Sequence, residues 1–97
     1  MELLSGLLNG LDIIQRVNAK DVQINQIEFD SRKVCQGTLF VAQRGVVSDG
    51  HNYLDSAISN GAVAVVVEEL PQNINDEVVY IQVENSSYAL GILAKNY

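Results

Sequence analysis

The chain has 97 residues, enough for one compact domain and too few for an enzyme built from two. Six Lys and Arg residues against twelve Asp and Glu residues give a net charge of −6, which argues against nucleic acid or an anionic membrane surface as the main partner. The single cysteine, Cys35, excludes an internal disulfide, and one cysteine with one histidine cannot complete a closed zinc site. Hydrophobic residues make up 47% of the chain, so we expect a buried core.

A leucine-rich segment opens the chain. Five leucines recur there at helical spacing and predict a short amphipathic helix: Leu3, Leu4, Leu7, Leu8 and Leu11. Glu2 stands where a secretory signal would be basic, and the longest apolar run, residues 62–67, is too short to cross a bilayer. We therefore expect a cytoplasmic protein.

Four segments have strand patterns. Apolar residues alternate from Val22 to Phe29, with a slip after Ile24. Residues 38–42 and 78–83 form compact apolar runs, and residues 62–67 are β-branched and almost wholly apolar, as in a strand buried on both sides.

Two further segments have helix patterns. Residues 53–58 place apolar side chains, Tyr53 among them, on one helical face, and Asn60-Gly61 supplies a C-cap signal. Residues 89–94 predict a final helix with Ser86 or Ser87 as its N-cap. Strands interleaved with helices predict an α/β fold, with a small mixed sheet flanked by helices.

The segment from Gly45 to Gly50 has the glycine spacing of a phosphate-binding loop. His51 and Asn52 stand where such a loop has its lysine and its serine or threonine, so the charge for the phosphates and the hydroxyl for Mg²⁺ are both missing. An ATP site is excluded here. A turn before a helix is the simpler interpretation.

Asp30-Ser31-Arg32 directly follows a predicted strand. These side chains either form a capped turn or face a ligand at a strand end. Ser31 is a poor candidate for a nucleophile, because the only imidazole, His51, is more typical of a helix start than of a general base.

Two other features also favour a structural interpretation. Cys35 is expected to be a bystander thiol, although Arg32 and Lys33 lie nearby in the sequence. Glu68-Glu69 is expected to be a solvated strand end. The residues therefore predict a small α/β binding module with no catalytic residue and no metal site.

Several short segments form a recognisable series in a fixed order: Phe29-Asp30-Ser31-Arg32-Lys33-Val34, residues 37–42, Gly45 with Asp49-Gly50-His51, Ala57, and residues 61–66. The series resembles the N-terminal domain of the Mur ligase family, in particular the MurE type, and the resemblance extends from Met1 to Tyr97. Ligases of this type use ATP to add the third residue of the peptidoglycan stem peptide. Their N-terminal domain holds the uridine-diphosphate end of UDP-N-acetylmuramoyl-L-Ala-D-Glu.

The resemblance implies which residues contact this nucleotide. Phe29 and Ser31 match positions at the uridine nucleotide, and the loop after the 38–42 strand supplies Val46, Val47 and Ser48. Val46 and Val47 can contribute only backbone groups, whereas Ser48 also has a hydroxyl. Whether Arg32 contacts the diphosphate or pairs with Asp30 or Asp49 stays open.

The resemblance also implies a domain organisation. Residues 1–97 would be a single substrate-binding domain, with the central ATPase and C-terminal domains, and the ATP and Mg²⁺ they use, outside this chain. The expected partners are UDP-N-acetylmuramoyl-dipeptide and those domains, in a bacterial cytoplasm, and this segment alone would catalyse nothing. Two alternatives remain: the same domain of the related MurF-type ligase that adds D-Ala-D-Ala, or a stand-alone ligand-binding domain.

Overall fold

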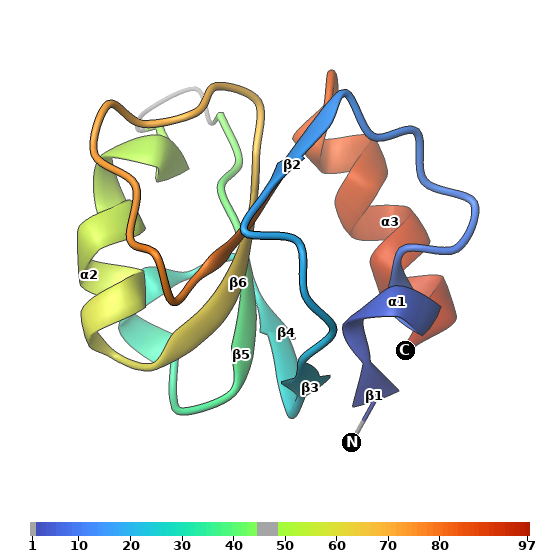
Figure 1. Ribbon diagram of the computed structural model, residues 1–97, viewed down its shortest axis with the longest axis horizontal. Coiled ribbons are helices and arrows are strands. Elements are labelled where there is room, and N and C mark those ends of the chain that lie inside the picture. Colours follow the sequence, from blue (N-terminus) through green and yellow to red (C-terminus); the bar gives the residue numbers. More distant parts are fainter. Residues whose placement is uncertain (1, 45–48) are drawn as a thin grey trace.

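The computed structural model describes residues 2–44 and 49–97. These residues form three layers, with a five-stranded sheet between α2 (Leu54–Ser59) on one face and α1 (Leu4–Leu7) and α3 (Ser86–Asn96) on the other (Figure 1). The expected α/β class, a small mixed sheet flanked by helices, is confirmed.

The main sheet has the strand order β2-β7-β6-β5-β4. Its strands are β2 (Gln15–Val17), β4 (Gln26–Glu28), β5 (Thr38–Val41), β6 (Ala62–Val67) and β7 (Val79–Gln82). Strands β4, β5, β6 and β7 run parallel, and β2 pairs antiparallel with β7. A separate antiparallel pair joins β1 (Glu2–Leu3) to β3 (Gln23–Ile24).

Alternating side chains of β5, of Ala42 directly after it and of β6 supply the core on both faces of the sheet. Leu39, Val41, Ala64 and Val66 pack on the α1 and α3 side, and Phe40, Ala42, Val65 and Val67 pack on the α2 side. All eight are fully buried. Burying a side chain as large as valine or phenylalanine contributes about 1.5–3 kcal/mol, so this sheet centre supports both helical layers. The continuous apolar run at residues 62–67 correctly predicted a strand buried on both sides.

Gly61 permits the sharp entry into β6. Its φ is +119°, and a Cβ there would lie 2.6 Å from the Cα of Gln36. The backbone nitrogen of Gly37 donates a hydrogen bond to the Gly61 carbonyl at 3.0 Å. The predicted end of α2 at Asn60-Gly61 is confirmed, and glycine is required there both by the backbone conformation and by the close approach.

The first two elements are shorter than predicted. The opening helix is one turn, Leu4–Leu7, because Leu3 belongs to β1 and the chain turns at Gly10 with a φ of +84°. The single strand expected from Val22 to Phe29 is wrong: β3 and β4 belong to two different sheets. The slip in the alternation after Ile24 marks the break at Asn25.

Two other differences lie at the sheet edge and at the last helix. Strand β2 was not predicted, because an exposed edge strand is polar and only its pairing with β7 defines it. The N-cap of α3 is Asn85, whose side chain accepts a hydrogen bond from the Tyr88 nitrogen at 2.9 Å. The expected caps, Ser86 and Ser87, are instead the first residues of the helix.

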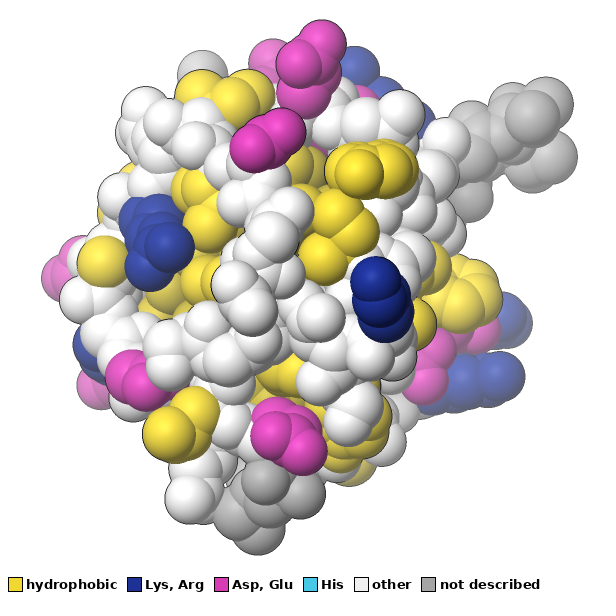
Figure 2. Space-filling model, turned by 90° about the vertical axis from the view of Figure 1, so that its right-hand side faces the viewer, with side chains coloured by type: hydrophobic (Ala, Val, Ile, Leu, Met, Phe, Trp, Pro, Cys, Tyr) yellow, Lys and Arg dark blue, Asp and Glu magenta, His cyan; other side chains and the backbone are white. Residues whose placement is uncertain are grey.

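The described surface on the α1 and α3 side is largely uncharged. Figure 2 shows hydrophobic and other uncharged side chains over most of this face, with Lys, Arg, Asp and Glu side chains among them. None of the helices in the described part of the chain is long and apolar enough to span a membrane.

Candidate functional site

The carboxyl ends of β4, β5 and β6 lie at the same edge of the sheet, because the three strands are parallel. Polar residues follow each of them: Asp30 to Arg32 after β4, Gln43 and Arg44 after β5, and Glu68 and Glu69 after β6. An open pocket lies after β4 and β5, and a network of polar contacts lies after β5 and β6.

The pocket has a volume of about 420 Å³. Seven residues line it: Phe29, Asp30, Ser31, Arg32, Gln43, Gly50 and Tyr53. Phe29 is 57% exposed and Tyr53 is 44% exposed, so two aromatic rings are available to solvent beside polar groups. Such rings can stack on a flat heterocycle while the polar groups orient it.

Asp30 organises the chain after β4. It is the N-cap of the short 3₁₀ helix Ser31–Lys33, and its Oδ1 accepts a hydrogen bond from the Arg32 nitrogen at 3.0 Å. The Arg32 guanidinium donates to both carboxylate oxygens, Nε to Oδ1 at 3.0 Å and Nη2 to Oδ2 at 2.8 Å. The side-chain hydrogen bond from Arg32, followed by the backbone one, lowers the pKa of Asp30 to about 2. Arg32 therefore pairs with Asp30, yet its side chain stays 87% exposed.

Ser31 has a hydroxyl that is available to a ligand. Among the residues that the structure describes, no hydrogen bond engages it, although the Ser31 carbonyl accepts one from the Asn60 side chain at 3.2 Å. The structure thus brings Phe29 and Ser31 together at one pocket. Of the other residues singled out in the sequence, Val46, Val47 and Ser48 lie outside the described ranges.

Gly50 forms part of the pocket wall by lying directly against the backbone of Gln43. The Gly50 nitrogen donates to the Gln43 carbonyl at 2.6 Å, and a Cβ at Gly50 would lie 2.7 Å from the Gln43 nitrogen. Only glycine allows this approach.

Three of the lining residues were not predicted from the sequence: Gln43, Gly50 and Tyr53. The helical spacing placed Tyr53 on a buried face, but Tyr53 precedes α2 in a 3₁₀ turn (Gly50–Tyr53) and is largely exposed. An aromatic residue just before a helix start was the available signal.

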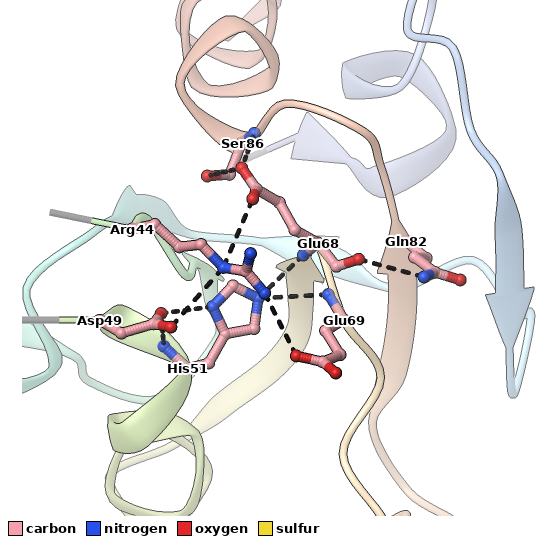
Figure 3. Close-up of polar contacts among 7 residues, drawn as sticks. All are labelled: Arg44, Asp49, His51, Glu68, Glu69, Gln82 and Ser86. Atoms are coloured by element: carbon pink, nitrogen blue, oxygen red, sulfur yellow. Dashed lines mark hydrogen bonds and ion pairs between the residues drawn. The ribbon is translucent and has the colours of Figure 1, made fainter.

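His51 connects the turn after β5 to the end of β6 (Figure 3). Its Nε2 accepts hydrogen bonds from the backbone nitrogens of Glu68 at 2.9 Å and Glu69 at 3.3 Å. Since a backbone N–H can only donate, Nε2 carries no proton, and Nδ1 donates to Asp49 Oδ1 at 2.6 Å. Both ring nitrogens are therefore engaged in hydrogen bonds within the chain.

Glu68 links the same network to α3. Its Oε2 accepts from the Ser86 nitrogen at 2.8 Å and from the Ser86 hydroxyl at 2.9 Å. The backbone hydrogen bond from Ser86 is the main cause that lowers the pKa of Glu68. The expectation of a solvated strand end is wrong for Glu68, whose side chain is 19% exposed, and correct for Glu69, whose side chain is 78% exposed.

Arg44 balances the acidic groups of this network. Its Nε lies 3.6 Å from both Asp49 Oδ2 and Glu68 Oε1, and its Nη2 donates to Glu69 Oε2 at 3.2 Å. The guanidinium is thus shared among three carboxylates. Within residues 2–44 and 49–97, no three His, Cys, Asp or Glu side chains are grouped as metal ligands.

The fold and the pocket together are those of an α/β domain with a candidate ligand site at the carboxyl edge of the parallel strands of its sheet. Comparison with known proteins defines the family: the model described as "Mur ligase family, catalytic domain" matches residues 23–97, and the chain belongs to this family.

The chain is similar to two bacterial ligases named UDP-N-acetylmuramoyl-L-alanyl-D-glutamate–2,6-diaminopimelate ligase. The protein of Parabacteroides distasonis is 44% identical over 94 residues, which is 97% of this chain and 19% of the relative. That of Cytophaga hutchinsonii is 44% identical over 92 residues, which is 94% of this chain and 19% of the relative. The chain therefore spans about a fifth of the length of these relatives.

Solved structures that are similar to this chain include MurF ligases. The MurF of Acinetobacter baumannii matches with a TM-score of 0.65 and 28% identity, over 79% of this chain and 16% of that protein. The MurF ligase of Thermotoga maritima, solved in complex with ADP, matches with a TM-score of 0.63 and 36% identity, over 72% of this chain and 16% of that protein.

Proposed function

We propose that residues 1–97 form the N-terminal domain of a Mur ligase and bind the uridine-diphosphate part of UDP-N-acetylmuramoyl-L-Ala-D-Glu. The observation that carries the proposal is the pocket between Phe29, Ser31 and Tyr53 at the ends of β4 and β5. Uracil is flat and polar at its edge, so it suits exposed aromatic rings beside the Ser31 hydroxyl. The exposed Arg32 guanidinium adds a positive charge for the diphosphate, even while Asp30 holds it in place.

The loop residues Val46, Val47 and Ser48 belong to the proposal on sequence grounds alone. They lie between Arg44 and Asp49, and the flanking residues Gln43 and Gly50 line the pocket. Their proposed contacts are backbone hydrogen bonds to the nucleotide, with a further one from the Ser48 hydroxyl.

The ligase as a whole is proposed to add the third residue of the stem peptide in the bacterial cytoplasm. The relatives at 44% identity, named for addition of 2,6-diaminopimelate, support the MurE type over nearly the full chain. The MurF alternative, addition of D-Ala-D-Ala, rests on the structural similarity at 28% and 36% identity. Turnover of the dipeptide nucleotide rather than the tripeptide nucleotide by the complete ligase separates the two.

The proposed reaction needs residues that bind ATP and Mg²⁺, and residues 1–97 do not supply them. The sequence has no glycine loop followed by lysine and serine or threonine, so ATP and Mg²⁺ are assigned to the central domain of the proposed ligase. Residues 1–97 would orient the nucleotide sugar, and the peptide bond would form elsewhere.

The proposal is tested by replacing Ser31 with alanine in the complete ligase. Loss of about one hydrogen bond to the nucleotide should raise the KM for UDP-N-acetylmuramoyl-L-Ala-D-Glu by about tenfold, with kcat little changed. Ser56→Ala is the matched control, because Ser56 is an exposed serine of α2 that does not line the pocket.

Chemical shifts locate the binding surface independently. Addition of the dipeptide nucleotide to the isotope-labelled chain should move the amide signals of Phe29, Ser31 and residues 46–48. Shifts confined to other surfaces at saturation, or an unchanged KM for Ser31→Ala, would contradict the assigned site.

A further inference from the structure

His51 joins three parts of the chain that are distant in sequence. Its ring contacts Asp49 in the turn after β5 and the backbone nitrogens of Glu68 and Glu69 at the end of β6, and Glu68 in turn holds Ser86 at the start of α3 (Figure 3). The side chain is only 12% exposed. The turn that carries His51 therefore has a defined position relative to β6.

This turn also forms one wall of the pocket. Gly50, between Asp49 and His51, lines the pocket and donates to the Gln43 carbonyl at 2.6 Å. A displacement of His51 relative to β6 would move Gly50 and change the shape of the pocket.

The His51 ring can accept hydrogen bonds from the backbone at the end of β6 only in its neutral form. The neutral tautomer donates from Nδ1 to Asp49 and accepts at Nε2, but a second proton on Nε2 would face the two N–H groups of Glu68 and Glu69, which are donors themselves. The contact with Asp49 survives protonation, whereas the contacts with β6 do not. Histidine is the side chain whose charge ordinarily changes between about pH 5 and 8.

The charged groups around the ring come from three segments. Asp49 lies on the same turn, Glu68 and Glu69 follow β6, and Arg44 follows β5 and lies between the three carboxylates. α3 presents Ser86, which is uncharged. Asp49, Glu68, Glu69 and Arg44 are therefore the charged groups that a change at the ring would affect.

We propose that His51 is a positioning residue for the nucleotide pocket: its neutral imidazole ties the Asp49–Gly50 turn to β6, and a second proton on the ring releases the turn and weakens nucleotide binding. This inference rests on the proposed function, because it takes the pocket to be the uridine-nucleotide site.

Two substitutions distinguish the hydrogen bond of Nδ1 from those of Nε2. His51→Gln keeps a hydrogen-bond acceptor near the position of Nε2 but lacks the Nδ1 donor, and His51→Asn keeps a donor near Nδ1 but does not reach β6. The Kd of the complete ligase for UDP-N-acetylmuramoyl-L-Ala-D-Glu is measured by calorimetry from about pH 8 to about pH 5.5. Asn52→Ala, at an exposed neighbour, is the control and should match the unmodified ligase.

The unmodified ligase should bind about tenfold more weakly at the acidic end, from loss of the Nε2 contacts. His51→Asn should bind about tenfold more weakly at both ends, and His51→Gln should stay within about twofold of the unmodified value at pH 8 with a flat profile. Equal affinities and equal pH profiles for His51→Asn and the unmodified ligase would overturn the inference.

Hydrogen exchange without nucleotide provides a second measurement. Protection factors of the Glu68 and Glu69 amides should fall in His51→Asn and at acidic pH, and should persist in His51→Gln. Unchanged protection in His51→Asn would show that the ring does not hold β6 and would overturn the inference by itself. Failure of the unmodified ligase to bind the nucleotide would instead overturn the proposed function, while these protection factors would still decide whether His51 holds β6.

Discussion

Replacing Glu68 with alanine removes the carboxylate oxygen that accepts both the backbone N–H and the hydroxyl of Ser86, at 2.8 Å and 2.9 Å. Ser86 is 1% exposed, so water cannot readily take the place of the carboxylate. A hydrogen bond to a charged group contributes about 1.5–3 kcal/mol. The free energy of unfolding of the chain should therefore fall by about 2–4 kcal/mol in Glu68→Ala. Glu68→Gln, which keeps a neutral acceptor, should lose about 1 kcal/mol.

Urea unfolding followed by circular dichroism measures these differences, with Glu69→Ala as the matched control. Glu69 is the next residue, its side chain is 78% exposed, and its hydrogen bond to Arg44 at 3.2 Å is a surface contact. Its loss should change the free energy of unfolding by no more than about 0.5 kcal/mol. Equal losses for Glu68→Ala and Glu69→Ala would show that the hydrogen bonds from Ser86 to Glu68 do not stabilise the start of α3.

Gly61→Ala should lower the free energy of unfolding by at least about 2 kcal/mol in urea titrations, because φ is +119° and the new Cβ would lie 2.6 Å from the Gln36 Cα. Gly6→Ala, where a Cβ meets no atom within 4 Å, should leave stability equal or slightly higher, and similar losses at both glycines would contradict this reasoning. Hydrogen bonds from Ser86 and His51 lower the carboxyl pKa values of Glu68 and Asp49, respectively. The stabilisation that these two carboxylates contribute is complete above about pH 4.5 and is lost as the pH falls through their folded pKa values. The urea concentration at the midpoint of unfolding should therefore decrease below about pH 4.5, and the decrease should be smaller in Glu68→Gln.

Patterns within a few residues of one another predicted much of the fold. The apolar runs of β5, β6 and β7 and the Asn60-Gly61 end of α2 were located from the sequence, because buried parallel strands and glycine C-caps have strong local signatures. The break at Asn25 was visible only as a slip in the alternation. Strand β2 has no such signature, since it is defined by its pairing with β7.

Some features of the candidate site were likewise predicted from the sequence, and others were not. Phe29 and Ser31 were singled out from the sequence through the resemblance to the Mur ligases, and the structure places both at one pocket. The sequence also left open whether Arg32 contacts the diphosphate or pairs with Asp30 or Asp49. The two hydrogen bonds to Asp30 show the pair with Asp30, and they depend on the local 3₁₀ geometry, whereas contact with the diphosphate stays a prediction.

By itself, the sequence determined the α/β class, the buried strands and the family resemblance, because each depends on residue types at short or regular spacing. Only the tertiary structure decided that Tyr53 lines the pocket, that Glu68 accepts hydrogen bonds from Ser86 at the start of α3 and that His51 accepts hydrogen bonds from the end of β6. These hydrogen bonds of Glu68 and His51 join residues 17 or 18 positions apart. Their partners meet because parallel strands bring their carboxyl ends to one edge of the sheet, and spacing along the chain does not encode such meetings.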